Sequence, residues 1–518
     1  MLLLLLFALI SGPDYYDALL FLAGAGTIEE LSEEDMERYD NLAKHPIDIN
    51  NASRSKLLSC GLFTRFQVAS IVEYRQMSGD ILSLVELSLV DGFNSELADA
   101  LSHFISVKSR FPGSHRDSRD FSQDLVLASA LRSSDEELES TYKIKYHAEL
   151  GSVAELYWTS RTSYSEPEPN LGVVSAAVYG KRHLGKLVLG SYSARFGQGL
   201  NQWSGFSLSG YSSISAFHKK ASGIAASPSA SASHIGVASD WELGRFGLSA
   251  AADIVGKSGV AHLDWSGRNL TLGSTISSTA SSLDLRYGFA DISLFGETSW
   301  HYRNQIAALA GLLWIPEYGR NLALQARYYS PEYKEYSGIA LGYSDASVFA
   351  SADFAVRGGK AQYKLLAQCK PKLSPSDSLG LSPQLRINLR YRPDESAPLR
   401  VDVRADCLLT SGRMSFALRY NALWCRSFAH MAYLQASHKT EKLTMSARAT
   451  VYKVDNWDDR IYVYEQDAPG TFNVPALYGR GWKASLFCAW HINRSHSLWL
   501  RLEYKPERTE VKLQYRWR

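Results

Sequence analysis

Residues 511–518 read VKLQYRWR, and their side chains alternate between two kinds. Val511, Leu513, Tyr515 and Trp517 are apolar or aromatic, and the residues between them are polar or charged. Successive side chains of a β-strand point to opposite faces, so this spacing predicts a strand with one apolar and one polar face.

The same alternation recurs through most of the chain. It is clear at 482–492 and 498–504, and Lys505–Arg508 forms a turn before the last strand. Similar segments are Tyr142–Leu150, Leu187–Arg195, Ile292–Tyr302, Ala323–Tyr329, Leu399–Leu408, Met414–Tyr420 and Leu443–Tyr452.

Two features favour a membrane barrel over a soluble sandwich. Roughly two dozen such segments fit into residues 124–518, and their polar faces carry Arg and Lys in mid-strand, where a soluble core would be apolar. Closure also removes the edges that so many strands would expose. We therefore predict a large antiparallel transmembrane β-barrel of about 22–26 strands over 124–518, of the bacterial outer-membrane type, following a small all-α domain.

Composition excludes several other classes. The 518 residues are 45% hydrophobic and 21% charged with a net charge of +2, which is typical of neither a disordered nor a collagen-like chain. The longest apolar run, Met1–Ile10, is shorter than the roughly 18–20 residues of a membrane-spanning helix. The cysteines lack zinc, redox or disulfide-scaffold spacing; they are Cys60, Cys369, Cys407, Cys425 and Cys488.

Charge is unevenly distributed. Residues 26–107 hold 14 acids and 6 bases, a net charge of −8, whereas 108–518 hold 37 acids and 49 bases, a net charge of +12. Such asymmetry predicts two modules with different surroundings.

The N-terminal 25 residues resemble a secretory signal peptide. Met1–Ile10 would be its apolar region, and Ser11-Gly12 or Ala23–Gly26 its small-residue end; the alternative is a short buried helix.

An acidic helix is predicted within residues 26–45. Thr27 and Glu30 have the spacing of a capping box, and Pro46 would end the helix after about Ala43. We interpret its many acids as a solvated face, namely Glu29, Glu30, Glu33, Glu34, Asp35, Glu37 and Asp40.

Residues 46–107 predict two short helix pairs with Ser or Asn caps and tight Gly turns. Residues 47–58 read IDINNASRSKLL and 71–75 read IVEYR; a second copy follows at 82–107. This order and spacing resemble a competence-type (ComEA-like) helix-hairpin-helix domain. The resemblance implies that backbone amides of each hairpin meet a DNA phosphate, here at Gly61, Leu62 and Thr64, and at Gly92, Phe93 and Asn94.

The hairpins depart from the family pattern. Thr64 and Asn94 stand where the family has a final glycine, and residues 46–107 carry a net charge of −3. Because DNA affinity depends mostly on neutralising phosphates, we expect the hairpins to contact a protein, with DNA binding as the alternative.

Two further stretches extend the resemblance over nearly the whole chain. Residues 187–206 and 459–481, together with the hairpins, look like bacterial helix-hairpin-helix proteins with a C-terminal outer-membrane barrel. A polar segment at 108–123, broken by Pro112-Gly113, is the predicted linker.

No catalytic constellation is recognisable. The 13 histidines are scattered and form no His-x-Ser pair with an orienting group, and Gly197-Gln198-Gly199 lacks the context of a phosphate loop. Asp455, Asp458 and Asp459 could hold a hard cation, although a solvated loop stabilised by Arg460 and Arg480 is favoured.

The expected function is therefore non-enzymatic, without cofactor or metal. We expect an outer-membrane barrel in contact with lipid, and a periplasmic helix-hairpin-helix module that docks a periplasmic or membrane protein. Such a protein would serve as a scaffold, assembly or transport component; the alternative is a DNA-uptake component.

Overall fold

The computed structural model describes residues 15–108, 121–134, 137–168, 171–180, 183–205, 210–229, 234–289, 291–302, 304–316, 320–371, 373–376, 379–506 and 508–518. The Met1–Ile10 stretch, Pro112-Gly113 and Phe206 lie outside these residues.

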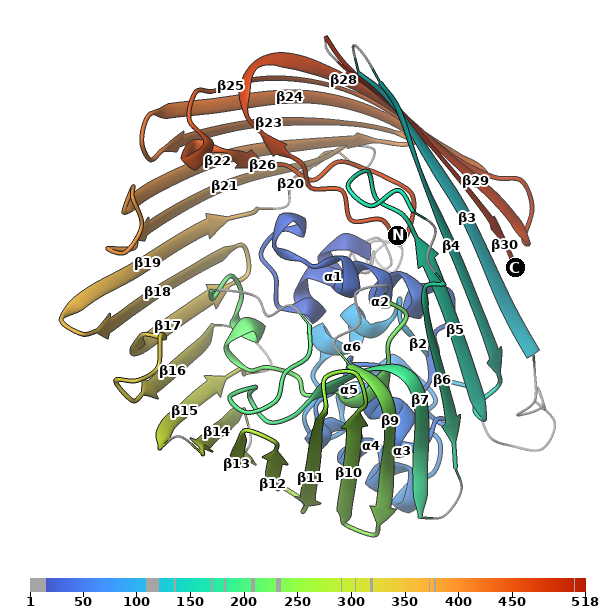
Figure 1. Ribbon diagram of the computed structural model, residues 1–518, viewed down its shortest axis with the longest axis vertical. Coiled ribbons are helices and arrows are strands. Elements are labelled where there is room, and N and C mark those ends of the chain that lie inside the picture. The colour runs from blue at the N-terminus through green and yellow to red at the C-terminus, as the bar shows by residue number, and fades with distance from the viewer. Residues whose placement is uncertain are drawn as a thin grey trace, which may run out of the picture.

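A closed antiparallel barrel of 24 strands follows a small helical region, as predicted (Figure 1). Its ring strands are β3 (Phe121–Ser134), β4 (Leu138–Leu150), β5 (Ala154–Arg161), β6 (Val173–Tyr179), β7 (Leu184–Arg195), β9 (His234–Leu243), β10 (Phe246–Asp253), β11 (Ser258–Ser266), β12 (Leu270–Ser277), β13 (Ala280–Phe289), β14 (Ile292–His301), β15 (Gln305–Trp314), β16 (Asn321–Tyr329), β17 (Ser337–Asp345), β18 (Val348–Arg357), β19 (Lys360–Cys369), β21 (Leu379–Tyr391), β22 (Leu399–Ser411), β23 (Met414–Trp424), β24 (Phe428–Lys439), β25 (Leu443–Val454), β28 (Gly479–His491), β29 (His496–Lys505) and β30 (Arg508–Trp517). Short strands lie beside the ring or in its loops, namely β8 (Gly223–Ala226), β20 (Leu373–Ser376), β26 (Ile461–Tyr462) and β27 (Ala476–Leu477).

Pairing of the first and last strands closes the ring. β3 and β30 are antiparallel, with Leu125 opposite Trp517, so neither strand leaves a free edge. Up-and-down connectivity gathers the turns at two ends. We call the end that holds Phe121 and Arg518 the short-turn end, and the opposite end the long-loop end because it carries the longest connections, 196–233 and 455–478.

Apolar side chains point out of the barrel at alternate strand positions. Leu513 is 47% exposed, whereas its neighbour Gln514 is 4% exposed and faces the lumen. Exposed aromatic side chains gather towards both rims, as the sequence predicts; they are Trp241, Phe246, Trp314 and Trp490 at the short-turn end, and Trp300, Tyr328, Trp424 and Trp482 at the long-loop end.

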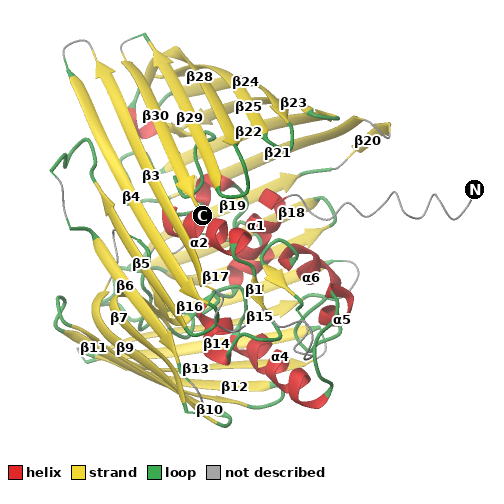
Figure 2. Ribbon diagram, turned by 90° about the vertical axis from the view of Figure 1, so that its right-hand side faces the viewer, coloured by secondary structure: helices red, strands yellow, loops and turns green. Residues whose placement is uncertain are grey.

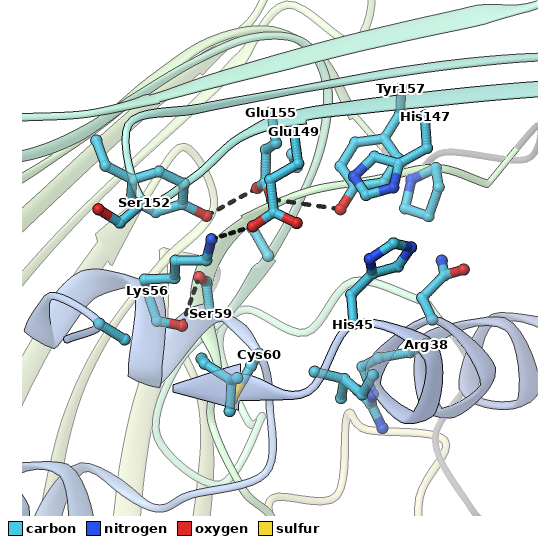
Figure 3. A pocket seen from close by; sticks show the side chains of 18 of the residues that line it. Arg38, His45, Lys56, Ser59, Cys60, His147, Glu149, Ser152, Glu155 and Tyr157 are labelled. Carbon is cyan, nitrogen blue, oxygen red and sulfur yellow. Dashed lines mark hydrogen bonds and ion pairs between the residues drawn. The ribbon is translucent and has the colours of Figure 1, made fainter. Parts of the chain in front are cut away.

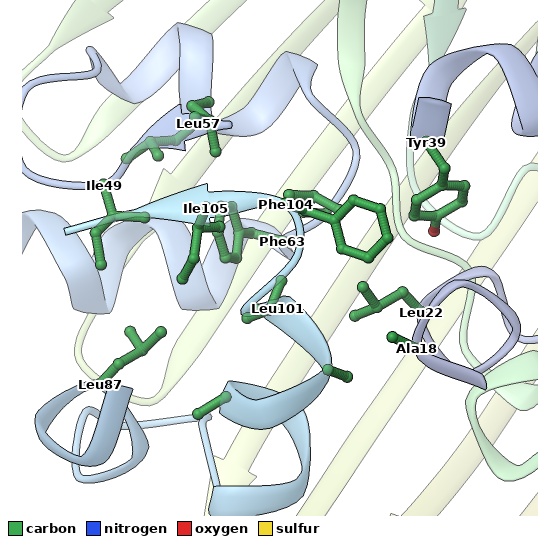
Figure 4. Packing of buried hydrophobic residues seen from close by; sticks show 14 of the residues in the cluster. Ala18, Leu22, Tyr39, Ile49, Leu57, Phe63, Leu87, Leu101, Phe104 and Ile105 are labelled. Carbon is green, nitrogen blue, oxygen red and sulfur yellow. The ribbon is translucent and has the colours of Figure 1, made fainter. Parts of the chain in front are cut away.

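Residues 15–108 fold into one compact unit, which we call the helical module. Its helices are α1 (Tyr15–Ala23), the 3₁₀ turn η1 (Ile28–Glu30), α2 (Glu33–Lys44), α3 (Arg54–Ser59), α4 (Arg65–Met77), α5 (Leu84–Ser88) and α6 (Ser95–Leu101). A single apolar core joins them, and Figure 4 shows Leu22, Tyr39, Leu57, Phe63 and Phe104 within it. No helix in the described ranges is long and apolar enough to cross a bilayer.

The module differs from the prediction in three ways. Its acidic helix begins at Glu33, because Ser32 and Asp35 form the capping box while the Thr27 side chain makes no cap bond. It is not purely helical, since β1 (Ile47–Asp48) pairs in parallel with β2 (Ile105–Ser106). The predicted divisions at residues 25 and 45 do not separate its parts, since all of them share one core.

The module lies inside the barrel. Figure 1 shows its helices enclosed by the ring of strands, and Figure 2 shows the same arrangement from the side. Near the short-turn end α3 contacts β7 and β8, and α4 contacts β11 and β12. Deeper in the lumen, α1 contacts the turn η2 (Ile214–Phe217), which belongs to the long connection between β7 and β9. The expectation of a separate periplasmic module is therefore corrected: the lumen holds it.

Candidate functional site

The functional candidate is the seam between the helical module and the lumen wall. At its deepest point Glu29 accepts hydrogen bonds from Arg419 Nη1 at 2.6 Å and Arg404 Nη1 at 3.1 Å. The backbone N–H of Tyr464, from the connection between β25 and β28, donates to the same carboxylate at 3.2 Å. Burial alone would raise the pKa of Glu29, but the two guanidinium groups outweigh it and hold that pKa well below its usual range.

The other acids of the module's first helices also reach wall residues. Each pairs with a base from a different strand or loop: Asp17 with Lys370, Glu30 with Arg386, Glu33 with Arg161, Glu34 with Arg195, and Glu37 with Lys145. The prediction of a solvated acidic face is therefore wrong. The reason is that the barrel encloses this face and supplies a cation to five of its seven carboxylates, whereas Asp35 pairs with Arg38 of the same helix and Asp40 accepts hydrogen bonds from Tyr15 and from the backbone N–H of Gly470.

The polarity of the seam reverses where α3 and α4 meet the wall near the short-turn end, although Asp17 of α1 pairs with Lys370 at that end too. Here the module supplies the bases: Arg54 and Arg65 pair with Asp264 at 3.1 and 3.5 Å, and Lys56 pairs with Glu149. The opposed charges favour one orientation of the module, with its acidic end deep and its basic end at the mouth.

Buried ion pairs of this kind hold the module in place more than they add net stability. Desolvation offsets much of the attraction, but removing one partner leaves an unpaired buried charge at a cost of about 3–5 kcal/mol. The charge asymmetry of the sequence is thus a complementarity between a net acidic module and a net basic barrel portion. The mid-strand Arg and Lys residues could be recognised in the sequence, whereas the acids of the helical module that pair with them could not be identified as their partners.

A cavity of about 900 Å³ interrupts the seam at one side (Figure 3). His45, Lys56 and Cys60 of the module line one wall, and Glu149 and Tyr157 of the barrel line the other. The module therefore fills the lumen incompletely on this side, and polar side chains of both parts face the space.

The first predicted hairpin is enclosed within the module. Gly61 adopts φ +73°, and a Cβ there would lie 3.1 Å from Nη1 of Arg38, so α2 covers the turn. Leu62 is buried, and Thr64 caps α4 through its side chain. A phosphate therefore has no open approach to these amides.

The second predicted hairpin is more open. Gly92 adopts φ +86° and packs on Phe66, and Phe93 is half-buried. The Asn94 side chain accepts the backbone N–H of Leu97 and thereby caps α6. The side chain that stands in place of the family's glycine therefore serves as the N-cap of this helix.

The acidic loop 455–459 uses its carboxylates internally. Asp455 pairs with Arg480 and Asp458 with Arg426, while Asp459 accepts the backbone N–H groups of residues 426 and 427. Within the described part of the chain, no three His, Cys, Asp or Glu side chains are grouped as metal ligands. Both predicted arginines contact the loop, since Arg480 pairs with Asp455 while Arg460 lies over the Trp457 ring and donates to the Trp457 carbonyl oxygen at 3.0 Å.

No family model matches the sequence, and no curated protein matches it either. Among solved structures, the chain is similar to the translocation pore of the P pilus usher PapC, at 6% identity over 76% of this chain and 98% of that one, with a TM-score of 0.40. It is also similar to Pseudomonas aeruginosa OpdQ (8% identity, 77% and 97%, TM-score 0.34) and to OccK7 (OpdD) of the same organism (11%, 77% and 97%, 0.33). At these values the likeness concerns the barrel fold alone.

Docking of the module should weaken in acid. Burial and the nearby His147 lower the pKa of His45 to about 4, with Glu149 opposing them and Arg516 and Arg518 adding to them. His45 of a released module would therefore bind a proton near pH 6.5, whereas His45 of the docked module would stay neutral until about pH 4. The free energy of docking thus becomes less favourable as the pH falls from about 6.5 towards 4. Glu29 adds a second loss below its ordinary pKa of about 4.3, since only its ionised form pairs with the arginines.

Protease cleavage of the module, followed in bilayers between pH 8 and pH 4, measures this effect. We expect faster cleavage with acidity, and His45→Gln should flatten the upper part of the profile. Slower cleavage at low pH would contradict the assignment.

Proposed function

We propose that this protein is an outer-membrane transport component whose barrel is closed by its own N-terminal module. The observation that carries the proposal is the module's position inside the lumen, held by ion pairs from strands around the barrel. The outward apolar side chains and aromatic rims support a lipid environment. Short turns usually face the periplasm, so the short-turn end would be periplasmic and the long-loop end extracellular.

Ion pairs suit a gate that must open. They fix the closed position, yet each can be exchanged for water or for another charged group when the module moves. An apolar plug surface would have no such exchange available. We therefore infer that transport requires the module to shift or leave the lumen.

Deletion of residues 15–107 tests the proposal. The intact chain in planar bilayers should show little conductance, whereas the deleted barrel should show large, steady channels. Heat-modifiable gel migration serves as the control that the deleted barrel is folded. Equal conductance of both folded proteins would overturn the proposal.

A partner for the module is the second part of the proposal. Four large side chains around α5 are strongly exposed: Met77 (80%), Leu82 (65%), Val85 (75%) and Leu89 (78%). Exposed acids surround them, namely Glu73, Asp91, Glu96 and Asp99. A basic, amphipathic segment of a periplasmic protein fits such a surface and would be placed to pull the module.

The double variant Val85→Lys/Leu89→Lys tests this docking surface, because lysines remove the apolar contact and also repel a basic segment. A photo-crosslinker at Leu82 should form a discrete adduct in wild-type cells that the double variant loses, while the barrel still assembles. An unchanged adduct would contradict the surface.

A further inference from the structure

A second cavity, of about 470 Å³, lies on the long-loop side of the lumen. It is bounded by the connection after β7, including Gly210 and Tyr211, and by the wall strands β15 to β21. Its described lining contains no residue of the helical module. A solute arriving at the long-loop end would therefore meet this cavity before the module.

The cavity lining has an excess of positive charge. Five bases line it, namely Lys219, Arg327, Lys364, Arg390 and Arg392, against the two acids Glu335 and Asp353. The three arginines already have partners: Arg327 binds Asp353, and Arg390 and Arg392 both bind Glu395.

The two lysines are left for a ligand. Neither Lys219 nor Lys364 forms an ion pair within the described part of the chain; Lys219 Nζ lies 4.9 Å from the Trp203 ring centroid. The Tyr329 hydroxyl belongs to the same lining and can donate to an oxyanion, whereas the Tyr336 hydroxyl already donates to Asp394.

Lys364 links this cavity to the tip of the module. It lies close enough to Glu30 for their charges to attract, and a side chain at Gly210 would collide with its ammonium group. Glu30 in turn accepts hydrogen bonds from Arg386 and from Ser212 Oγ, the latter at 2.9 Å. A negative charge placed at Lys364 would therefore repel the carboxylate of Glu30.

We infer that this cavity binds a small solute carrying a carboxylate or phosphate group, and that the bound anion repels Glu30 and thereby displaces it from Arg386. The second part of this inference, the displacement of Glu30, rests on the proposed function. It assumes that the carboxylate of Glu30 occupies a place in the closed barrel that the transported anion competes for. Repulsion between the solute and Glu30 would loosen the deep end of the module first. The basic end at the short-turn mouth would be unaffected.

Calorimetric titration of the full chain in detergent with citrate, and separately with inorganic phosphate, tests the site. Wild type should bind at least one of the two, and Lys219→Gln/Lys364→Gln should weaken that binding by about tenfold or more, since both charged donors to the anion are lost. Lys360→Gln is the matched control, because Lys360 lies on the same strand but is exposed and pairs with Asp394. No binding of either anion, or equal binding by the double variant, would overturn the site.

Protease cleavage of the module tests the coupling. Saturating anion should speed cleavage in wild type and leave the double variant unchanged. Binding without faster cleavage would overturn the displacement of Glu30. Binding that persists in a protein whose deletion variant fails to conduct would instead overturn the proposed function and retain the site.

Discussion

Replacing Glu29 with arginine should open the barrel. The substitution places a third cation against Arg404 and Arg419. Both arginine side chains are largely buried, and both already pair with Asp406. Breaking a buried pair costs about 3–5 kcal/mol, which corresponds to more than a hundredfold change in the ratio of docked to released module. Single-channel conductance in planar bilayers should rise from near zero towards that of the deleted barrel.

Two matched variants separate gating from misfolding. Glu73→Arg makes the same charge change on the exposed side of α4 and should leave conductance low. Adding Arg419→Glu to Glu29→Arg restores an oppositely charged pair and should lower conductance again. Low conductance of Glu29→Arg in a folded barrel would show that this cluster does not hold the gate.

Leu513→Arg should impair assembly of the barrel far more than Gln514→Arg. Leu513 points outward and is half-exposed, so an arginine there would meet lipid at a cost of roughly 2–4 kcal/mol near the midplane. Gln514 points inward and donates to the carbonyl oxygen of Pro469 at 3.1 Å, so its replacement loses one hydrogen bond of about 1 kcal/mol.

Folded yield in lipid vesicles, read from heat-modifiable migration, measures both variants. The inner neighbours Lys512 and Arg516 already carry charge at this level, pairing with Asp467 and Asp124, which is why the lumen side tolerates a cation. Equal yields would show that the inside and outside of β30 are assigned the wrong way round.

Local patterns predicted the barrel well. Alternation at 482–492 and 498–504 appears as β28 and β29 with the expected faces, because a strand's side-chain period is a local property. The segment at Met414–Tyr420 continues to Trp424, and the barrel begins at Phe121 rather than residue 124. Strand ends depend on where partners stop pairing, and the sequence of one strand does not contain that information.

The two helix pairs could also be predicted from the sequence, but a second capping signal placed the start of the acidic helix later than predicted. Thr27 and Glu30 had the right spacing, yet Ser32 and Asp35 formed the box. The η1 turn that results carries Glu29 and Glu30 towards the wall arginines. Of two local capping signals, the one at Ser32 is thus formed, and the turn before it faces the lumen wall.

The sequence by itself determined the strands, their inner and outer faces, the two short helix pairs and the opposite net charges of the two parts. Only the tertiary structure decided that these charges meet inside the barrel. Glu29 and Arg419 are 390 positions apart, and attraction between them leaves no periodic trace along the chain. A face rich in carboxylates looks the same in a sequence whether water or a ring of arginines surrounds it, because the surroundings come from strands folded around it.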